Sequence, residues 1–170
     1  ALAVVAPASG QCEVDKLIAS DGAAADFFGW SVSVSGGAAV AGAHLHDVGG
    51  GSNYGAAYIY RRQTDGSWLE EQKIQSTDIA LGDWFGHSVC IDGNLLAVGA
   101  YRDDDFGGNS GSAYVFRRVG VTWGQEMKLL PPTGAANDNF GWAVAIDGDG
   151  CVVGAPGEGA AGAVHVFRGA

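Results

Sequence analysis

The densest group of metal-binding side chains in this sequence is Asp103-Asp104-Asp105, with Asn109 and Ser110 close behind. A Ca²⁺ ion takes about six to eight oxygen ligands from carboxylates, amides and backbone carbonyls, so this segment is a candidate calcium site. Consecutive side chains point in different directions, however, and do not all converge on one ion. The sequence leaves two interpretations open, a calcium site and a solvated acidic loop, and we prefer the acidic loop.

A second candidate site is aromatic. Trp30, Trp84, Tyr101 and Trp142 each lie close to a Phe-Gly pair or at the end of a short apolar run. Exposed aromatic rings stack on sugars or anchor protein partners, since they combine a large apolar face with a polar edge. Aromatic residues at equivalent places in a repeat also fill the space between repeats, and we prefer this packing role. The binding role requires exposed rings, and the packing role requires buried rings.

The residue types that carry catalysis show no convergent spacing. We find no Ser/His/Asp arrangement, no pair of catalytic carboxylates and no phosphate-binding loop. His87 stands where the other repeats have Trp30 and Trp142, and His165 stands where another repeat has Tyr114. Substitution for aromatic residues favours packing over acid–base chemistry. The sequence therefore predicts a protein that is not an enzyme and has no cofactor beyond the candidate calcium ion.

The charge balance excludes one class of partner. The chain has 19 acidic and 9 basic side chains, a formal charge of −10. Nucleic acid binding depends on Lys and Arg that neutralise phosphates, so we expect no nucleic acid partner. The longest apolar runs are far shorter than the roughly 20 residues that span a bilayer, so we expect no membrane span.

The three cysteines, Cys12, Cys90 and Cys151, have no zinc-binding spacing and fall at different places in the repeat. An odd number cannot pair completely within one chain. We expect them to be small buried side chains, and the alternative is a Cys12–Cys151 disulfide.

The elements that must position these residues come from a threefold internal repeat. Each repeat has a Phe-Gly pair, then a Gly-Ala pair at a constant distance, then a short apolar strand, and a period of this size indicates a repeat architecture. The Phe-Gly pairs are Phe28-Gly29, Phe85-Gly86 and Phe140-Gly141, and the Gly-Ala pairs are Gly42-Ala43, Gly99-Ala100 and Gly154-Ala155. An Asp precedes each Phe-Gly pair (Asp26, Asp83 and Asp138), and we expect it to cap the turn through backbone amides rather than to bind a ligand.

The second repeat shows the local structure. Residues 87–91, 95–100, 112–117 and 123–130 alternate or are continuously apolar, which predicts four antiparallel strands joined by short turns. No stretch has a helical apolar stripe, so we predict no helix. A repeated four-stranded meander of about 50 residues is a propeller blade. We expect an all-β chain of three such blades, with each repeated Phe in the wedge between neighbouring blades.

These motifs resemble FG-GAP repeats, which form the propeller of integrin α subunits and many surface proteins. The resemblance covers most of the chain, with repeats at about 28–75, 85–130 and 140–168 of a single domain, 1–170. It implies an extracellular or cell-surface propeller. Many family members carry a DxDxDG calcium loop between the two motifs. The turns here are too short for one, so that function is not transferred.

The first and last residues of the sequence fall at different positions of the repeat. Lys16, Lys73 and Lys128 lie at the same distance before a Phe-Gly pair, so residues 11–18 correspond to a fourth strand, preceded by an apolar arm at 1–10. The third blade lacks its own fourth strand. We expect the N-terminal strand to complete the last blade, either in the same chain or in a neighbouring subunit. Closure within one chain makes a ring of three blades, below the usual range of about four to eight.

Two functions of different classes follow from the sequence. The first is a non-enzymatic extracellular structural or adhesion module, a homo-oligomer that assembles into a ring or filament through the N-terminal strand and the open edge of the last blade. The second is a lectin-like propeller that binds glycans or a surface protein between its blades. The interface candidates are the aromatic residues Trp30, Trp84, Tyr101 and Trp142 together with Val14 and Leu17 of the N-terminal strand.

Overall fold

The computed structural model describes residues 13–49 and 52–169, and within these ranges it contains strands and turns but no helix. The all-β class predicted from the sequence is confirmed. Nothing in the described part of the chain is a helix long and apolar enough to cross a membrane. The strands are β1 (Ser31–Ser35), β2 (Ala38–Ala43), β3 (Ala56–Arg62), β4 (Trp68–Ile74), β5 (Ser88–Asp92), β6 (Leu95–Ala100), β7 (Ser112–Val119), β8 (Thr122–Leu129), β9 (Ala143–Asp147), β10 (Gly150–Ala155) and β11 (Ala163–Arg168).

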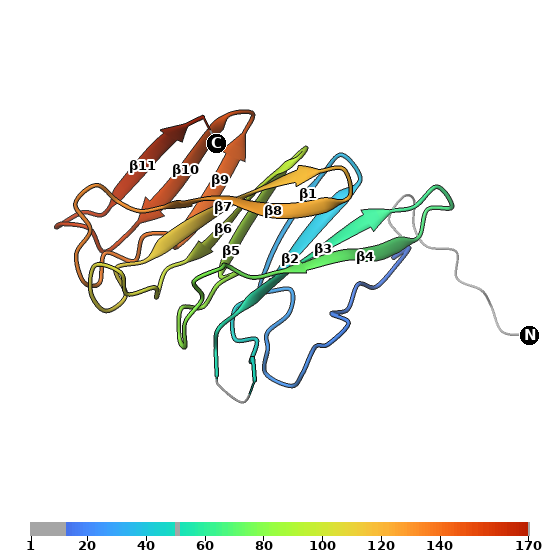
Figure 1. The fold of residues 1–170 in the computed structure, drawn as a ribbon, viewed down its shortest axis with the longest axis horizontal. Helices are drawn as coiled ribbons and strands as arrows, with labels where there is room; N and C mark the ends of the chain where they lie inside the picture. Colours follow the sequence, from blue (N-terminus) through green and yellow to red (C-terminus); the bar gives the residue numbers. More distant parts are fainter. Residues whose placement is uncertain (1–12, 50–51, 170) are drawn as a thin grey trace, which may run out of the picture.

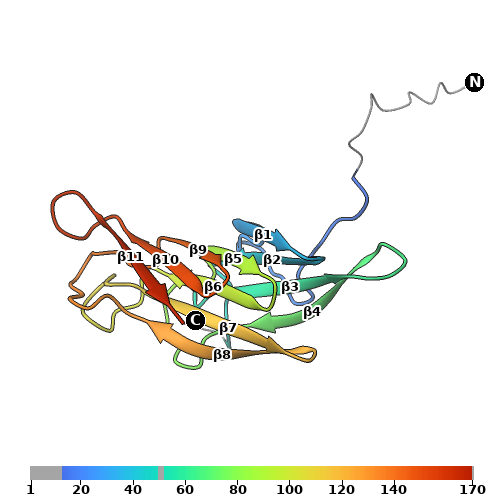
Figure 2. The same cartoon turned by 90° about the horizontal axis from the view of Figure 1, so that it is seen from above.

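The strands form three antiparallel sheets that follow the three repeats. We call them blade one (β1-β2-β3-β4), blade two (β5-β6-β7-β8) and blade three (β9-β10-β11). Figure 1 shows the blades side by side in one row, with blade one and blade three at opposite ends and the inner strands β1, β5 and β9 against one another. The view from above in Figure 2 shows the same row as an open arc. The chain is therefore an incomplete propeller.

Blade two shows why these residues form strands. β6 is buried along its whole length, because its sheet is covered on both faces and a continuous apolar run suits that environment. β5 alternates instead, so that Val89 and Ile91 are buried while Cys90 between them is half-buried. The turn between β5 and β6 requires a positive φ, which Gly93 adopts at 55° without steric cost.

The cores lie between the blades. The first joins blade one to blade two and contains Val40 and Ile59 from one side and Phe85 from the other. The second joins blade two to blade three around Phe140. Both phenylalanines are 0% exposed, which confirms the predicted wedge role of the Phe-Gly motif.

Each joint also has a repeated polar contact at the inner strands. The Ser31 hydroxyl donates to the Gly86 carbonyl over 2.8 Å, and the Ser88 hydroxyl donates to the Gly141 carbonyl over the same distance. The two joints are therefore built alike, both in apolar packing and in hydrogen bonds.

The predicted pairing of the N-terminal strand with the last blade does not form within this chain. Residues 13–19 belong to no strand, and they lie along blade one at the opposite end of the row from β11 (Figure 1). The physical reason is distance, because the open arc separates the two ends of the row. Completion by a neighbouring subunit stays a prediction, and residues 1–12 lie outside the described residues.

The cysteines follow the preferred interpretation where the structure describes them. Cys90 and Cys151 are free thiols, and Cys151 is fully buried in the joint between blades two and three. Burial raises the pKa of Cys151 to about 11, which keeps this thiol protonated. The alternative Cys12–Cys151 disulfide is wrong for Cys151, since its sulfur lies inside the joint. Cys12 is not among the described residues.

Candidate functional site

The four predicted aromatic residues meet in one row across the three blades. The ring of Trp30 lies 4.6 Å from His44, and His44 lies 5.1 Å from Trp84. Trp84 is 5.6 Å from Tyr101, which in turn is 4.6 Å from Trp142. All these values are centroid distances between rings. His87 and Phe27 extend the same row, which we call the aromatic row.

Repetition explains how the aromatic row arises. One ring position follows each Phe-Gly pair, and a second follows the Gly-Ala pair in the first two repeats. A third precedes the Phe-Gly pair. Because the blades stand side by side, equivalent positions line up from blade to blade. The members are Trp30, His87 and Trp142 at the first position, His44 and Tyr101 at the second, and Phe27 and Trp84 at the third.

Two members of the aromatic row have a strained backbone. Phe27 and Trp84 have φ angles of 55° and 59°, in the left-handed region that bulky residues rarely adopt. The third repeat has Asn139 at the same place with φ 55°, and Asn tolerates this conformation at lower cost. Strain of this kind clusters at functional sites, so an aromatic side chain at these positions indicates a role beyond turn formation.

The aromatic row is partly open, and its buried histidine is uncharged. Phe27, Trp30 and Trp142 are about half exposed, whereas His44 is buried and its Nδ1 atom has no hydrogen-bond partner. Burial, followed by the charge of His87, lowers the pKa of His44 to about 4, so this ring is neutral at pH 7. The Arg102 guanidinium lies 3.9 Å above the Trp84 ring. Such a surface can stack on flat or apolar ligand faces, and the preferred packing role accounts for only part of it.

Two of the three predicted calcium ligands, Asp103 and Asp105, lie around a lysine. The Lys128 ammonium is 2.6 Å from Asp105, 2.7 Å from Asp78 and 3.0 Å from Asp103, and Asp103 also accepts the Tyr114 hydroxyl at 2.9 Å. Burial opposes the charge of Lys128, but hydrogen bonds to the three carboxylates outweigh burial and raise its pKa.

Asp104 is exposed and lies apart from this cluster. A calcium ion would have to displace Lys128. The described residues include no group of three or more His, Cys, Asp or Glu placed to hold a metal ion.

The Asp before each Phe-Gly pair caps its turn, as the sequence predicts. Asp26, Asp83 and Asp138 accept hydrogen bonds from the backbone amides of Ala23, Ala80 and Ala135, at 2.8, 2.6 and 2.7 Å. Burial raises the pKa of Asp83 to about 6, with the charges of Asp103 and Asp104 acting in the same direction against the stabilising Ala80 amide.

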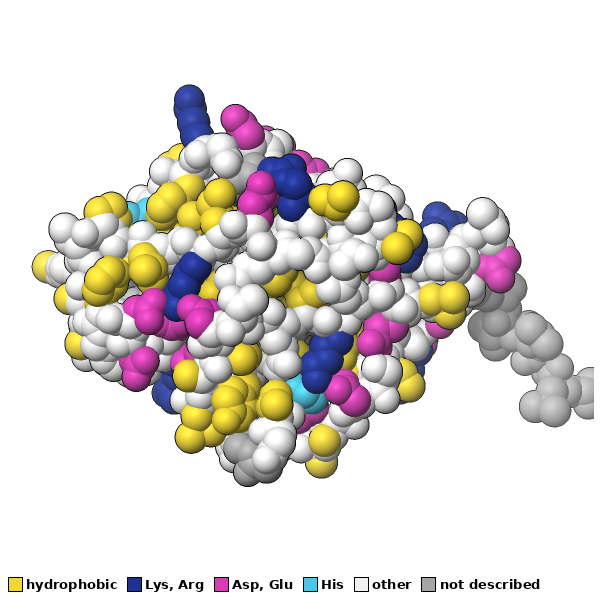
Figure 3. All heavy atoms as spheres, viewed as in Figure 1, with side chains coloured by type: hydrophobic (Ala, Val, Ile, Leu, Met, Phe, Trp, Pro, Cys, Tyr) yellow, Lys and Arg dark blue, Asp and Glu magenta, His cyan; other side chains and the backbone are white. Residues whose placement is uncertain are grey.

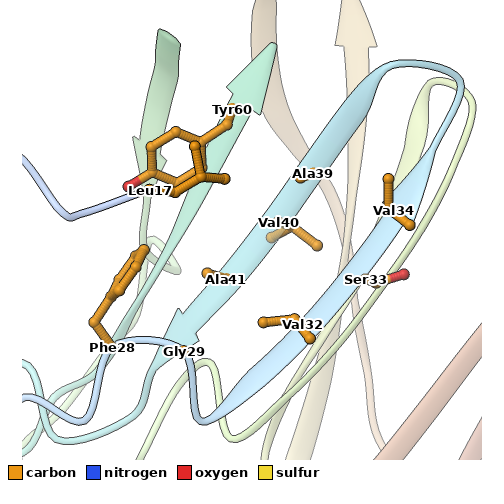
Figure 4. A pocket seen from close by; sticks show the side chains of 10 residues that line it. All are labelled: Leu17, Phe28, Gly29, Val32, Ser33, Val34, Ala39, Val40, Ala41 and Tyr60. Carbon is orange, nitrogen blue, oxygen red and sulfur yellow. The ribbon is translucent and has the colours of Figure 1, made fainter. Parts of the chain in front are cut away.

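The N-terminal candidates lie on the end of blade one. Leu17 packs with Phe28 and Tyr60 around an apolar hollow on this face, whereas Val14 is 80% exposed. Figure 4 shows the Leu17, Phe28 and Tyr60 side chains together on one side of the hollow, with Val32 and Val34 of β1 on the other side. We call this surface of blade one the leading face; its members are Phe28, Val32, Val34, Ala39 and Tyr60.

The opposite end of the row carries a second apolar surface. On blade three, Ala145, Val152, Val164 and Val166 share the side of the sheet that points away from blade two. We call it the trailing face. Figure 3 shows hydrophobic side chains scattered over this end of the molecule, where β9 to β11 lie in Figure 1. The repeat pattern predicts the open edge of blade three but none of these side chains. Aligning each with its buried counterpart in blade two would have found them.

Comparison with known families accounts for most of the chain. The family model described as FG-GAP repeat matches residues 12–60, 68–116 and 123–167, and each match contains the first two strands and most of the third strand of one blade, with the segment before them. No curated protein matches the chain in a sequence search.

Proposed function

The chain belongs to the FG-GAP repeat family, and from this premise we propose that it is a non-enzymatic extracellular structural or adhesion module that assembles through the two end faces of its row of blades. FG-GAP repeats are common in extracellular adhesion and binding modules, and the family is typically non-enzymatic. The observation that carries the proposal is the pair of uncovered leading and trailing faces.

The leading face is an exposed apolar surface whose counterpart in blade two is buried. Val32 and Val34 of blade one are 70% and 69% exposed, whereas their counterparts in blade two, Val89 and Ile91, are 8% and 4% exposed because blade one covers them. Burial of a side chain of this size contributes about 1.5 to 3 kcal/mol. The leading face is thus exposed on blade one, whereas the equivalent surface of blade two is buried, and this contrast supports an interface at the leading face.

The trailing face shows the same contrast. Val164 and Val166 of blade three are 67% and 69% exposed, and their counterparts Ala113 and Val115 of blade two are both 0% exposed beneath blade three. The two end faces therefore correspond to the two sides of one joint. A leading face fits a trailing face, which makes the contact head-to-tail rather than symmetric.

The mass of the chain in solution tests this assembly. We expect sedimentation velocity at rising concentration to give a species of at least twice 17.3 kDa. Val34→Glu and Val166→Glu, one on each end face, should each shift the equilibrium to the monomer. Val121→Glu is the matched control, since Val121 is 75% exposed on the β7–β8 hairpin and outside both faces. A monomer at every concentration overturns the proposal.

A second function is favoured by the aromatic row. Its half-exposed rings and the strained backbone at Phe27 and Trp84 support a lectin-like site that stacks on sugar rings. In a glycan array we expect binding that Trp30→Ala and Trp142→Ala each abolish. Phe106→Ala is the control, because Phe106 is similarly exposed but lies outside the row. An array without signal removes this function and leaves the assembly untouched.

A further inference from the structure

We propose that the partner at the end faces is a second copy of this chain, and that residues 13–17 of one copy become the missing fourth strand of blade three in the other, beside β11, with Lys16 paired to Glu158. The inference rests on the proposed assembly and names its partner and its register. Four independent features of the molecule support it.

The first feature is that the N-terminal segment already stands where an outer strand stands. Between blades one and two, the backbone amide of Trp123 donates to the side chain of Gln72 in β4 at 2.8 Å. At the leading face, the backbone amide of Trp68 donates to the side chain of Asp15 at 3.0 Å. Trp68 and Trp123 are equivalent, and so are Asp15 and Gln72. The N-terminal segment thus makes the same hydrogen bond as an outer strand, although it is not paired with any strand of a sheet.

A second contact repeats in the same way. The amide of Thr77 donates to Gln125 at 2.9 Å across the internal joint, and the amide of Ser20 donates to Glu70 at 2.9 Å at the leading face. The segment is therefore held at both ends in the position that β4 has relative to the next blade. A blade three that docks on the leading face brings the unpaired edge of β11 to this segment.

The third feature is an incomplete polar cluster in blade three. In blade two, Lys128 contacts Asp103, which also accepts a hydrogen bond from Tyr114. In blade one, Lys73 lies 2.6 Å from the equivalent His46, whose ring in turn lies 3.3 Å from the Tyr58 hydroxyl.

Blade three has the last two members of this cluster, with Glu158 2.6 Å from His165, but among the described residues no outer strand pairs with β11 to carry the lysine. Lys16 is the equivalent lysine, and it is exposed on the N-terminal segment. In the two complete blades Tyr58 pairs with Lys73 and Tyr114 with Lys128. The same register places Lys16 opposite His165, with its ammonium at Glu158.

The fourth feature is Gly154, a glycine that no close contact in the described chain requires. A Cβ on Gly42 or Gly99 would lie 1.9 Å from the carbonyl oxygen of the Gly after the next Phe, so both joints need a glycine there. Gly154 is the equivalent residue on the trailing face, and its nearest neighbour would be 3.7 Å away, on its own blade. A leading face docked there would bring the Gly29 carbonyl to Gly154.

A closed six-bladed ring is the form of this assembly that the three described blades favour. If the intermolecular joint repeats the internal one, each copy contributes the three blades that the structure describes. Six is the multiple of three within the usual range of about four to eight blades. Two copies therefore close one ring with two identical head-to-tail joints.

Charge reversal with mixing tests the proposed register. In Lys16→Glu alone or Glu158→Lys alone, both joints of the pair juxtapose like charges, and we expect each variant to self-associate at least about tenfold more weakly than the wild type. In an equal mixture, one joint has the native pair and the other has the reversed pair. We expect the mixture to recover the wild-type affinity to within about threefold.

A second measurement needs no variant. A carbodiimide joins a lysine amine to a carboxylate that it contacts, so it should link Lys16 to Glu158. With ¹⁵N-labelled and unlabelled chains mixed, mass spectrometry should find this link between chains of different label. The thermal unfolding of each variant as a monomer shows whether it is folded.

The outcomes separate the register from the assembly. Recovery on mixing together with the Lys16–Glu158 link supports the proposal. A wild type that dimerises, with variants that are unaffected or not rescued and without the link, overturns the register and leaves blade packing standing. A wild type that stays monomeric, with Val166→Glu without effect, overturns both.

Discussion

The trailing faces of blade two and blade three are built alike but lie in opposite environments. On blade two, Ala113 and Val115 are fully buried, and Gly99 is closely approached by the Gly141 carbonyl. On blade three, the equivalent Val164 and Val166 are exposed, and a Cβ on Gly154 would meet only Ala143 of its own blade, at 3.7 Å. The residue types at equivalent positions of the two blades therefore do not indicate whether a face is covered by another blade. What differs is only whether another of the described blades packs against the face.

The largest expected effect comes from the two glycines of this comparison. A Cβ at Gly99 would lie 1.9 Å from the Gly141 carbonyl, so Gly99→Ala forces the joint apart and should lower the free energy of unfolding by about 5 kcal/mol or prevent folding. Gly154→Ala should change it by no more than about 1 kcal/mol in the monomer, while abolishing assembly. Urea unfolding of dilute protein and sedimentation measure the two effects. Equal destabilisation by both variants would contradict the difference between the faces.

The wedge phenylalanines give the next largest difference. Phe85 is 0% exposed between blades one and two, so Phe85→Ala should cost about 4 kcal/mol in urea unfolding. Phe28 is the equivalent residue on the open leading face, where it touches the rings of Tyr58 and Tyr60 only from one side. We expect Phe28→Ala to cost about 1 to 2 kcal/mol in the monomer. A cost as large as that of Phe85→Ala would mean that the leading face is already covered.

The lysines of the polar clusters should differ in the same sense. Lys128→Met leaves the buried Asp103 without its counter-ion, and we expect a loss of about 2 kcal/mol after allowance for solvent screening. Lys16→Met should leave the monomer's unfolding free energy unchanged within about 0.5 kcal/mol, since Lys16 is exposed on the single chain. Parallel urea titrations of the two variants make this comparison. A large loss for Lys16→Met would place its ion pair within the chain.

The smallest expected effect is a pH dependence in the middle blade. The pKa of Asp83 is about 6 in the folded chain, above its ordinary value of 3.8, so the folded state holds this proton more tightly. The contribution of Asp83 to stability is present below pH 3.8 and is lost as the pH rises through 6. Asp83→Asn removes this dependence, so the unfolding free energy of the variant should rise relative to that of the wild type as the pH increases from 4 to 7. A constant difference between the two unfolding curves across this range would contradict the raised pKa.

The blades were predictable from the sequence because two local signals agree in them. Alternating or continuous apolar runs define the strands, and the recurring Phe-Gly and Gly-Ala motifs define where each blade begins. The strand predicted at 11–18 failed in residues 13–18 for a physical reason. A strand needs a hydrogen-bonded partner, and the edge that would pair with this segment lies at the far end of the same chain.

The candidate sites were predictable only in part. The members of the aromatic row were found as residue types, but their continuity depends on how closely neighbouring blades stand. The positive φ of Trp84 has no signature in a single repeat. Lys128 and Asp78 are 50 residues apart, and their ion pair arises only because a connecting segment returns to the outer strand.

The position of the two end faces at opposite ends of one row has a kinetic consequence. If two chains form one head-to-tail joint as proposed, their remaining faces are held near each other at an effective concentration in the millimolar range for short separations. The second joint then forms as an intramolecular step. Each joint can be individually weak while the pair is long-lived, and a chain leaves only when both joints open together.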